Sequence, residues 1–245
     1  MKNKAIKLTL FLFAFASIYS CGKEEKVTLE PCRFGYEFFP AETGKYWVYK
    51  IDSTVYFQEG LNANTTTSYI RDQIMGEFIK DNSAEYVVAR YFSRDGRSNW
   101  HWISTNVWNK DNQNFTITEG NLKFYKIGFP ISPSQNFKSI NFFDENVEFD
   151  IGGELVKVYK NWGRMAIVQL DDPCDESDDT FLTIRYADFD KLTEKRFVTE
   201  VYQKGIGMIE RTEEIFDTQI LNQELPWTEK VQKGYSLHKV LLDHN

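Results

Sequence analysis

Short runs of alternating apolar and polar residues, separated by turn residues, recur along most of the chain. Between Lys45 and Val55, for example, Trp47, Tyr49 and Ile51 alternate with polar positions. About a dozen such runs can be counted, and no stretch of about 12 residues has the period of an amphipathic helix. The pattern predicts an all-β, antiparallel fold made of sequential hairpins, either a single strongly curved sheet, an open barrel or a sandwich.

Three turn sequences predict particular hairpins. Asp95-Gly96 lies between two strand-like runs and suits a tight turn that needs positive φ. Gly152-Gly153 predicts a second hairpin, and residues 161–164 predict a third between Val158 and Ala166. Residues 187–193 are expected to form one or two helical turns. Later strands are expected over residues 180–186, 196–203, 206–220 and 235–242.

The first 20 residues have the pattern of a secretory signal. Three lysines precede an apolar run of 11 residues from Leu8 to Ile18, which is shorter than the about 20 residues that span a bilayer. The next segment, Ile18-Tyr19-Ser20-Cys21, resembles the lipobox of bacterial lipoproteins. The resemblance implies that Cys21 is the lipidation site, carrying an acyl chain such as palmitate.

The residues after Cys21 indicate where the chain is displayed. Gly22-Lys23-Glu24-Glu25-Lys26 resembles the charged signal that sends Bacteroidota lipoproteins to the outer face of the outer membrane. We therefore expect a lipid-anchored outer-membrane protein that faces the cell exterior. The expected organisation is a signal peptide over residues 1–20, the lipidated cysteine and tether over 21–33, and one β domain over 34–245.

The charge balance restricts the partners. Without the leader the chain has 26 basic and 36 acidic residues, a net charge of −10. Nucleic-acid binding needs clustered Lys and Arg, so the composition argues against it. It also argues against electrostatic adhesion to anionic lipid. The expected partners are the membrane, through the acyl anchor, and an extracellular protein or a glycan.

Two segments resemble a group of uncharacterised Bacteroidota lipoproteins. The first is Phe39-Pro40 followed by Gly44 and the Trp47-Val48-Tyr49 strand, and the second is the Tyr-x-x-Gly-Ile-Gly segment from Tyr202 to Gly207. The resemblance implies a surface location and a β fold. It supplies no catalytic residues and no cofactor.

Two cysteines remain besides Cys21. Cys32 and Cys174 would close a loop of 142 residues if they paired. Exported proteins often carry disulfides, so we predict this bond, with two free thiols as the alternative.

Three tryptophans, Trp100, Trp102 and Trp108, are candidates for ligand binding. Alternation along a strand would place Trp100 and Trp102 on the same face. Exposed indoles at that spacing could stack on sugar rings. The competing interpretation is that both indoles fill the core, as large aromatics do in most β proteins.

An acidic segment near Cys174 is a weak candidate for calcium binding. Six carboxylates within nine residues could supply the oxygen ligands that Ca²⁺ prefers, although the spacing is not that of an EF-hand. A solvated loop between strands is the alternative. The residues are Asp171, Asp172, Asp175, Glu176, Asp178 and Asp179.

No catalytic motif is present: the sequence has no His-Glu-x-x-His, nucleophile elbow or phosphate loop. We therefore expect a non-enzymatic binding or scaffold domain. The alternatives are a carrier of a lipid-like ligand on a concave sheet face and a glycan-binding or glycan-acting protein. An apolar cavity would favour the carrier, a flat aromatic row would favour glycan binding, and a cleft with two carboxylates would favour a glycosidase.

Overall fold

The computed structural model describes residues 29–58, 60, 62–177 and 179–245. The chain divides into two compact units, residues 1–30 and residues 31–245. The second unit is described here. The predicted signal peptide and the lipidation site at Cys21 lie outside the described residues. None of the helices within the described ranges has the length and apolarity needed to cross a bilayer.

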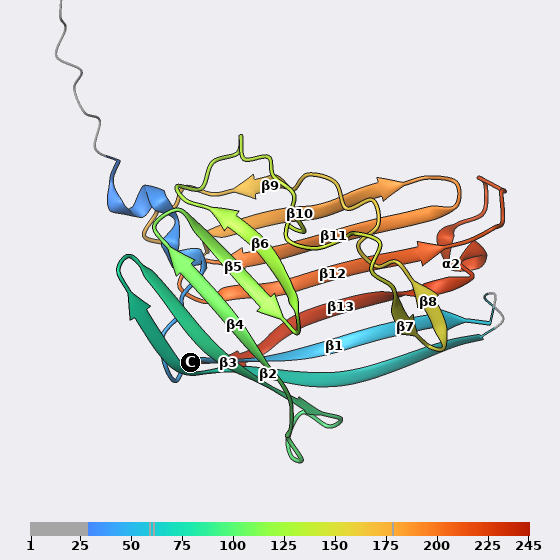
Figure 1. Ribbon diagram of the computed structural model, residues 1–245, viewed down its shortest axis with the longest axis horizontal. Helices are drawn as coiled ribbons and strands as arrows, with labels where there is room; N and C mark the ends of the chain where they lie inside the picture. Colours follow the sequence, from blue (N-terminus) through green and yellow to red (C-terminus); the bar gives the residue numbers. More distant parts are fainter. Residues whose placement is uncertain (1–28, 59, 61, 178) are drawn as a thin grey trace, which may run out of the picture. The chain divides into compact units, whose positions relative to one another are not determined.

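Residues 31–245 form an all-β fold, as predicted, dominated by one antiparallel sheet of 11 strands that curls into a half-barrel (Figure 1). The strand order is β6-β5-β4-β3-β2-β1-β13-β12-β11-β10-β9, so the last strand pairs with the first. The strands are β1 (Tyr46–Phe57), β2 (Asn62–Lys80), β3 (Ser83–Ser93), β4 (His101–Asp111), β5 (Asn114–Glu119), β6 (Leu122–Gly128), β9 (Ala166–Leu170), β10 (Phe181–Asp190), β11 (Glu194–Gln203), β12 (Gly207–Asp217) and β13 (Lys233–His244).

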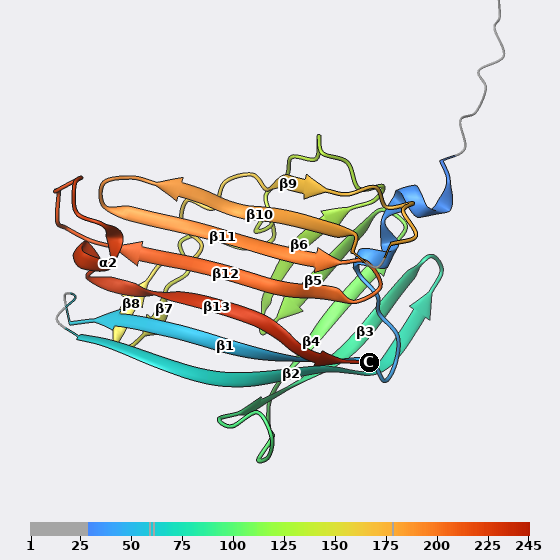
Figure 2. The same cartoon turned by 180° about the vertical axis from the view of Figure 1, so that it is seen from behind.

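The sheet curls so that its two halves face each other. Strands β4, β5 and β6 run steeply across β11–β13, in front of them in Figure 1 and behind them in Figure 2. Irregular registers, which increase the local bend of a strand, occur in β1 between Val48 and Tyr49 and in β11 between Val201 and Tyr202. The concave face is therefore enclosed between β4–β6 on one side and β11–β13 on the other.

The core follows the alternation that the sequence predicted. On β10 the inward residues Leu182 and Ile184 are fully buried, and on β11 the buried Val198 shares its face with two buried charged residues, Arg196 and Glu200. Two short 3₁₀ helices, η1 (Pro31–Phe34) and η2 (Tyr36–Phe38), precede the sheet. Phe38 and Phe39 at the end of this segment are buried in the same core. Lys110 of β4 holds the segment in place by donating to the carbonyl oxygens of Tyr36 and Phe39, at 3.0 and 2.8 Å.

Two of the predicted hairpins are present. Gly152-Gly153 joins β7 (Phe149–Ile151) to β8 (Glu154–Val156), which form a separate two-stranded sheet. Gly152 has a φ of +65°, and a Cβ there would lie 2.9 Å from Cγ1 of Val55, so this turn packs closely on β1. Asp95-Gly96 connects β3 to β4, but through a longer loop than the predicted two-residue turn. The Asp95 carboxylate accepts hydrogen bonds from the backbone N–H groups of Arg97 and Ser98, which hold the pKa of this carboxyl well below its usual range.

Two local predictions are wrong. Residues 161–164 do not form a hairpin, because β9 pairs with β10 and has no antiparallel partner before it. Trp162 is instead buried in the core, where its indole N–H donates to the carbonyl of Val158. The helix expected over residues 187–193 is also wrong, since β10 continues to Asp190 after an irregularity between Arg185 and Ala187. The β11 pairing therefore overrides the weak local preference.

Candidate functional site

A cavity of about 260 Å³ lies on the concave face of the sheet. Strands from both halves of the curl line it, together with the segment that follows η2. One part of its wall is aromatic and aliphatic, and includes Phe39, Trp47, Trp108, Phe115, Ile117 and Met208. Another part is charged, with four carboxylates and four basic side chains. The carboxylates are Asp72, Glu119, Glu200 and Glu213, and the basic residues are Arg90, Lys126, Arg211 and Lys239.

The first group of charges connects β2, β3 and β5. Arg90 and Asp72 lie opposite each other on neighbouring strands, and the guanidinium donates to both carboxylate oxygens at 2.6 and 2.9 Å. The same guanidinium also donates to Glu119 at 3.0 Å. Burial opposes ionisation of Glu119, but Arg90 and then Arg211 outweigh it and lower the pKa of this carboxyl to about 2.

The second group is centred on Glu200 of β11, which is almost fully buried. Its carboxylate accepts from Lys126 at 2.7 Å and from Arg211, and its other oxygen accepts from the hydroxyl of Tyr202. Burial raises the pKa of Glu200, but the two cations together lower it to about 2. Arg211 also pairs with Glu213, whose second oxygen accepts from another tyrosine hydroxyl, that of Tyr235, at 2.6 Å.

Lys239 is the exception in this charged wall. It lies opposite Arg211 on β12 and opposite Ile51 on β1, and only 6% of the residue is exposed. Among the described residues its ammonium has no hydrogen-bond or ion-pair partner, and it lies 3.9 Å from the centre of the Tyr49 ring. Burial is the main cause that lowers the pKa of Lys239 to about 8, against the opposing attraction of Asp72.

A second donor in the cavity wall also lacks a partner. The indole N–H of Trp108 is buried and has no hydrogen-bond acceptor in the described part of the chain. Trp108 packs against Trp47, with ring centres 5.3 Å apart, and against Phe115, at 5.8 Å. It is the one predicted binding tryptophan that lines the cavity.

The other two tryptophans lie elsewhere. Trp100 precedes β4 in the loop after β3, and Trp102 lies on β4 with 62% of its surface exposed. The expectation that Trp102 fills the core is therefore wrong. A register shift opposite Arg90 and Tyr91 interrupts the alternation along β4. Trp102 and Trp108 consequently do not form one aromatic face.

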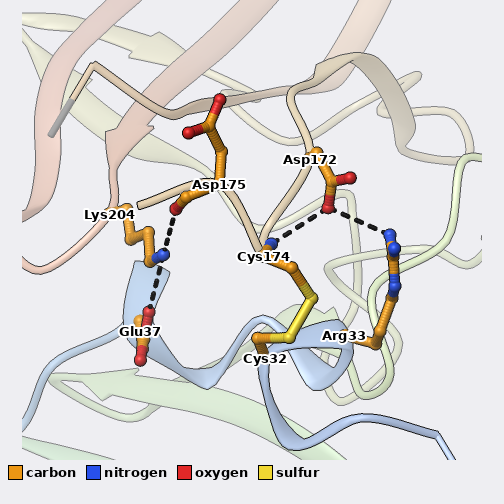
Figure 3. The surroundings of a disulfide bond; sticks show 7 residues. All are labelled: Cys32, Arg33, Glu37, Asp172, Cys174, Asp175 and Lys204. Carbon is orange, nitrogen blue, oxygen red and sulfur yellow. Dashed lines mark hydrogen bonds and ion pairs between the residues drawn. A yellow bond between two sulfur atoms is a disulfide. The ribbon is translucent and has the colours of Figure 1, made fainter. Parts of the chain in front are cut away.

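The two remaining cysteines form a disulfide, with Cα atoms 5.0 Å apart (Figure 3). The bond connects η1 to the loop between β9 and β10. Two side chains add polar contacts beside it: Arg33 donates to Asp172 at 2.9 Å, and Lys204 donates to the carbonyl of Asp175 at 2.6 Å (Figure 3).

The acidic loop uses part of its hydrogen-bonding capacity within the protein. The Asp172 carboxylate also accepts from the N–H of Cys174, Asp175 accepts from the N–H of Ser177, and Asp171 accepts from the N–H of Phe181. Glu176 and Asp179 belong to the same loop, and Asp178 is not described. Calcium binding at this loop stays a prediction.

Sequence reasoning missed the charged residues of the cavity. A signal was available in the strand pattern: Glu200 has the same parity along β11 as the buried Val198 and Tyr202. A charged residue at an inward position of a predicted strand indicates a polar site inside the fold.

No protein-family model and no curated protein matches the sequence. A candidate lipoprotein from Parabacteroides distasonis ATCC 8503 has a TM-score of 0.42 and 14% identity, over 88% of this chain and 100% of that chain. A candidate exported protein with a YmcC-like fold from Bacteroides fragilis NCTC 9343 has a TM-score of 0.40 and 13% identity, over 85% of this chain and 98% of that chain. Neither likeness assigns a function to this chain.

Proposed function

We propose that this chain is a lipid-anchored outer-membrane protein, facing the cell exterior, that binds a small amphiphilic molecule in the cavity of its concave sheet face. The anchor and location rest on the lipobox-like segment ending at Cys21 and on the charged residues after it. The binding function rests on one observation: the cavity joins an aromatic wall to a charged wall. An amphiphile has the same division into an apolar part and a polar part.

The size of the cavity supports a small ligand. Its volume of about 260 Å³ lies just below the roughly 300–1,000 Å³ of common small-molecule pockets. A ligand with one short hydrocarbon chain suits this volume better than a two-chain phospholipid.

The charge state of two of the four wall carboxylates supports a binding role. A glycosidase of the common type needs one carboxylic acid whose pKa is raised, so that it can protonate the leaving group. In the cavity the pKa values of Glu119 and Glu200 are instead both lowered to about 2. These carboxylates therefore act as permanent anions that hold Arg90, Lys126 and Arg211 in place.

The position of the tryptophans favours the cavity over a sugar platform. Stacking on successive sugar rings needs a row of exposed indoles. Trp102 is exposed, but Trp100 is partly buried and precedes β4, so strand alternation does not align the two indoles. Trp108 lies in the cavity wall against Trp47.

Titration with N-phenyl-1-naphthylamine, an uncharged fluorescent probe whose aromatic rings suit the apolar wall, tests the proposal. We expect saturable binding of one probe per chain. The variant Ile117→Trp places an indole in the cavity and should weaken binding at least about ten-fold, which corresponds to ~1.4 kcal/mol. The matched control is Val107→Trp on the adjacent strand, because Val107 is partly exposed outside the cavity.

Thermal melts of both variants would show that each one folds. Absence of saturable binding by the unaltered protein would contradict the proposal. Equal binding by the unaltered protein and a folded Ile117→Trp variant would also contradict it.

A further inference from the structure

The donors and acceptors of the cavity wall are unevenly satisfied. The acids have donors: Asp72 accepts two hydrogen bonds from Arg90, and Glu213 accepts from Arg211 and Tyr235. Glu200 accepts from three different side chains. Two donors of the wall make no hydrogen bond within the described part of the chain: the buried indole N–H of Trp108 and the ammonium of Lys239, which lies over the ring of Tyr49.

The basic residues of the wall also differ from one another in their ion pairs. Three basic residues, Arg90, Lys126 and Arg211, form ion pairs with the four carboxylates. Lys239 takes part in none of these ion pairs, and its ammonium lies 3.9 Å from the centre of the Tyr49 ring. A buried ammonium normally has a counter-ion or hydrogen-bond acceptors, because transfer of an unpaired charge out of water is costly.

From these contacts we infer that the ligand carries a carboxylate, which accepts hydrogen bonds from Lys239, and that its apolar chain lies against the aromatic wall. This inference rests on the proposed binding function and names the chemical class of its ligand: a short-chain carboxylic acid in its ionised form. An ionised acceptor suits the site better than a hydroxyl, because an anion also neutralises the charge of the ammonium, which is costly to hold unpaired away from water. The Trp108 N–H is a second donor in the same wall.

The surroundings of Lys239 limit which other head groups fit. A cationic head group would meet Lys239 and Arg211 side by side on neighbouring strands, while the nearby carboxylates are already occupied by their own partners. A hydroxyl head group could accept from Lys239 but would leave the charge of the ammonium unpaired. Carboxylate, alcohol and amine ligands of equal chain length are therefore expected to bind with decreasing affinity.

Isothermal titration with decanoate, 1-decanol and decylamine at pH 7 separates these cases. We expect decanoate to bind about ten-fold or more tightly than 1-decanol, and decylamine to bind most weakly. In Lys239→Met the affinity for decanoate should fall to that for 1-decanol, while the affinity for 1-decanol changes little. Lys239→Arg keeps a cation at the position and should retain part of the preference for decanoate. The matched control is Lys50→Met on β1, the strand next to β13, which removes a partly exposed lysine that pairs with Asp52 of the same strand.

The outcomes distinguish this inference from the proposed function. Equal affinities for decanoate and 1-decanol in the unaltered protein would overturn the carboxylate inference and leave amphiphile binding intact. The same conclusion would follow if a folded Lys239→Met variant kept the preference for decanoate. Failure of all three ligands and of the naphthylamine probe to bind would overturn the proposed function as well.

Discussion

The ammonium of Lys239 lies 3.9 Å from the centre of the Tyr49 ring, and the two residues stand on the neighbouring strands β13 and β1. The contact joins the first and last strands along the chain, which lie side by side in the middle of the sheet. A cation over an aromatic face gains about 0.5–2 kcal/mol, which is much less than the cost of an unpaired buried charge. The contact therefore positions Lys239 in the cavity without neutralising its charge.

The first prediction concerns pH. The groups that face Lys239 are Asp72 and Glu119, which favour its charged form, and Arg90 and Arg211, which disfavour it. Because burial lowers the pKa of Lys239 to about 8, the free protein loses this charge as the pH rises through 8. A bound carboxylate raises that pKa, so its affinity should be constant below about pH 8 and should fall above it. Titrations of decanoate between pH 6 and pH 10 check this, with 1-decanol as the pH-independent control.

The second prediction concerns Glu200 and stability. Its replacement by Gln leaves Lys126 and Arg211 buried with one fewer anion, which should lower the free energy of unfolding by about 3–5 kcal/mol at pH 7. The pKa of Glu200 is about 2 in the folded protein, below its ordinary value of 4.5. Its stabilising contribution is therefore complete above pH 4.5 and is lost as the pH falls toward 2. Urea denaturation of both proteins should show a difference that narrows over this range, and an equal stability at pH 7 would contradict the role of Glu200.

The third prediction concerns Trp102. Its side chain is largely exposed, so Trp102→Ala should change the free energy of unfolding by no more than about 0.5 kcal/mol. The matched control is Trp47→Ala, which removes a nearly fully buried indole and should cost about 3–5 kcal/mol. Thermal melts of the two variants measure both effects. A large loss of stability in Trp102→Ala would show that its indole is packed and not exposed.

The fourth prediction concerns the disulfide between Cys32 and Cys174. Its 142-residue separation implies a large restriction of the unfolded chain, and loss of such bonds typically costs about 2–5 kcal/mol. The double variant with serine at both positions should unfold at a lower temperature, measured against the oxidised protein. Reduction of the unaltered protein should lower its melting temperature to a similar degree. Two alkylatable thiols in freshly purified protein would contradict the bond.

The sequence was sufficient for the fold class because alternation along a strand is a local property. The strands over β1, β11 and β13 and the Gly152-Gly153 hairpin follow directly from it. The wrong predictions depended on which strands pair and in which register: β9 pairs with β10 after it, and an irregular register in the β3–β4 pair separates Trp102 from Trp108. A register shift moves a side chain to the other face of a sheet, and residue types alone do not reveal it.

The cavity could not be predicted for a related reason. Arg90 and Glu119 come from different hairpins, and Lys126 reaches Glu200 across the curl from a strand 74 residues earlier in the chain. Their charges were visible in the sequence, but their approach depends on the closure of the sheet. The sequence indicated Trp108 as a binding candidate because of its aromatic ring. It did not indicate the other residues of the cavity, because they come from both halves of the half-barrel.

The most direct test of the binding cavity is to map where a ligand attaches. Decanoate carrying a photoactivatable diazirine at its apolar end would be irradiated with the protein, and the labelled residues would be identified by mass spectrometry of a digest. We predict labels on cavity residues such as Trp108, Ile117 and Met208, and their loss in the presence of excess unlabelled decanoate. Labelling concentrated on the exposed Phe78 and Trp102, and unaffected by excess decanoate, would contradict the proposal that the concave face is the binding site.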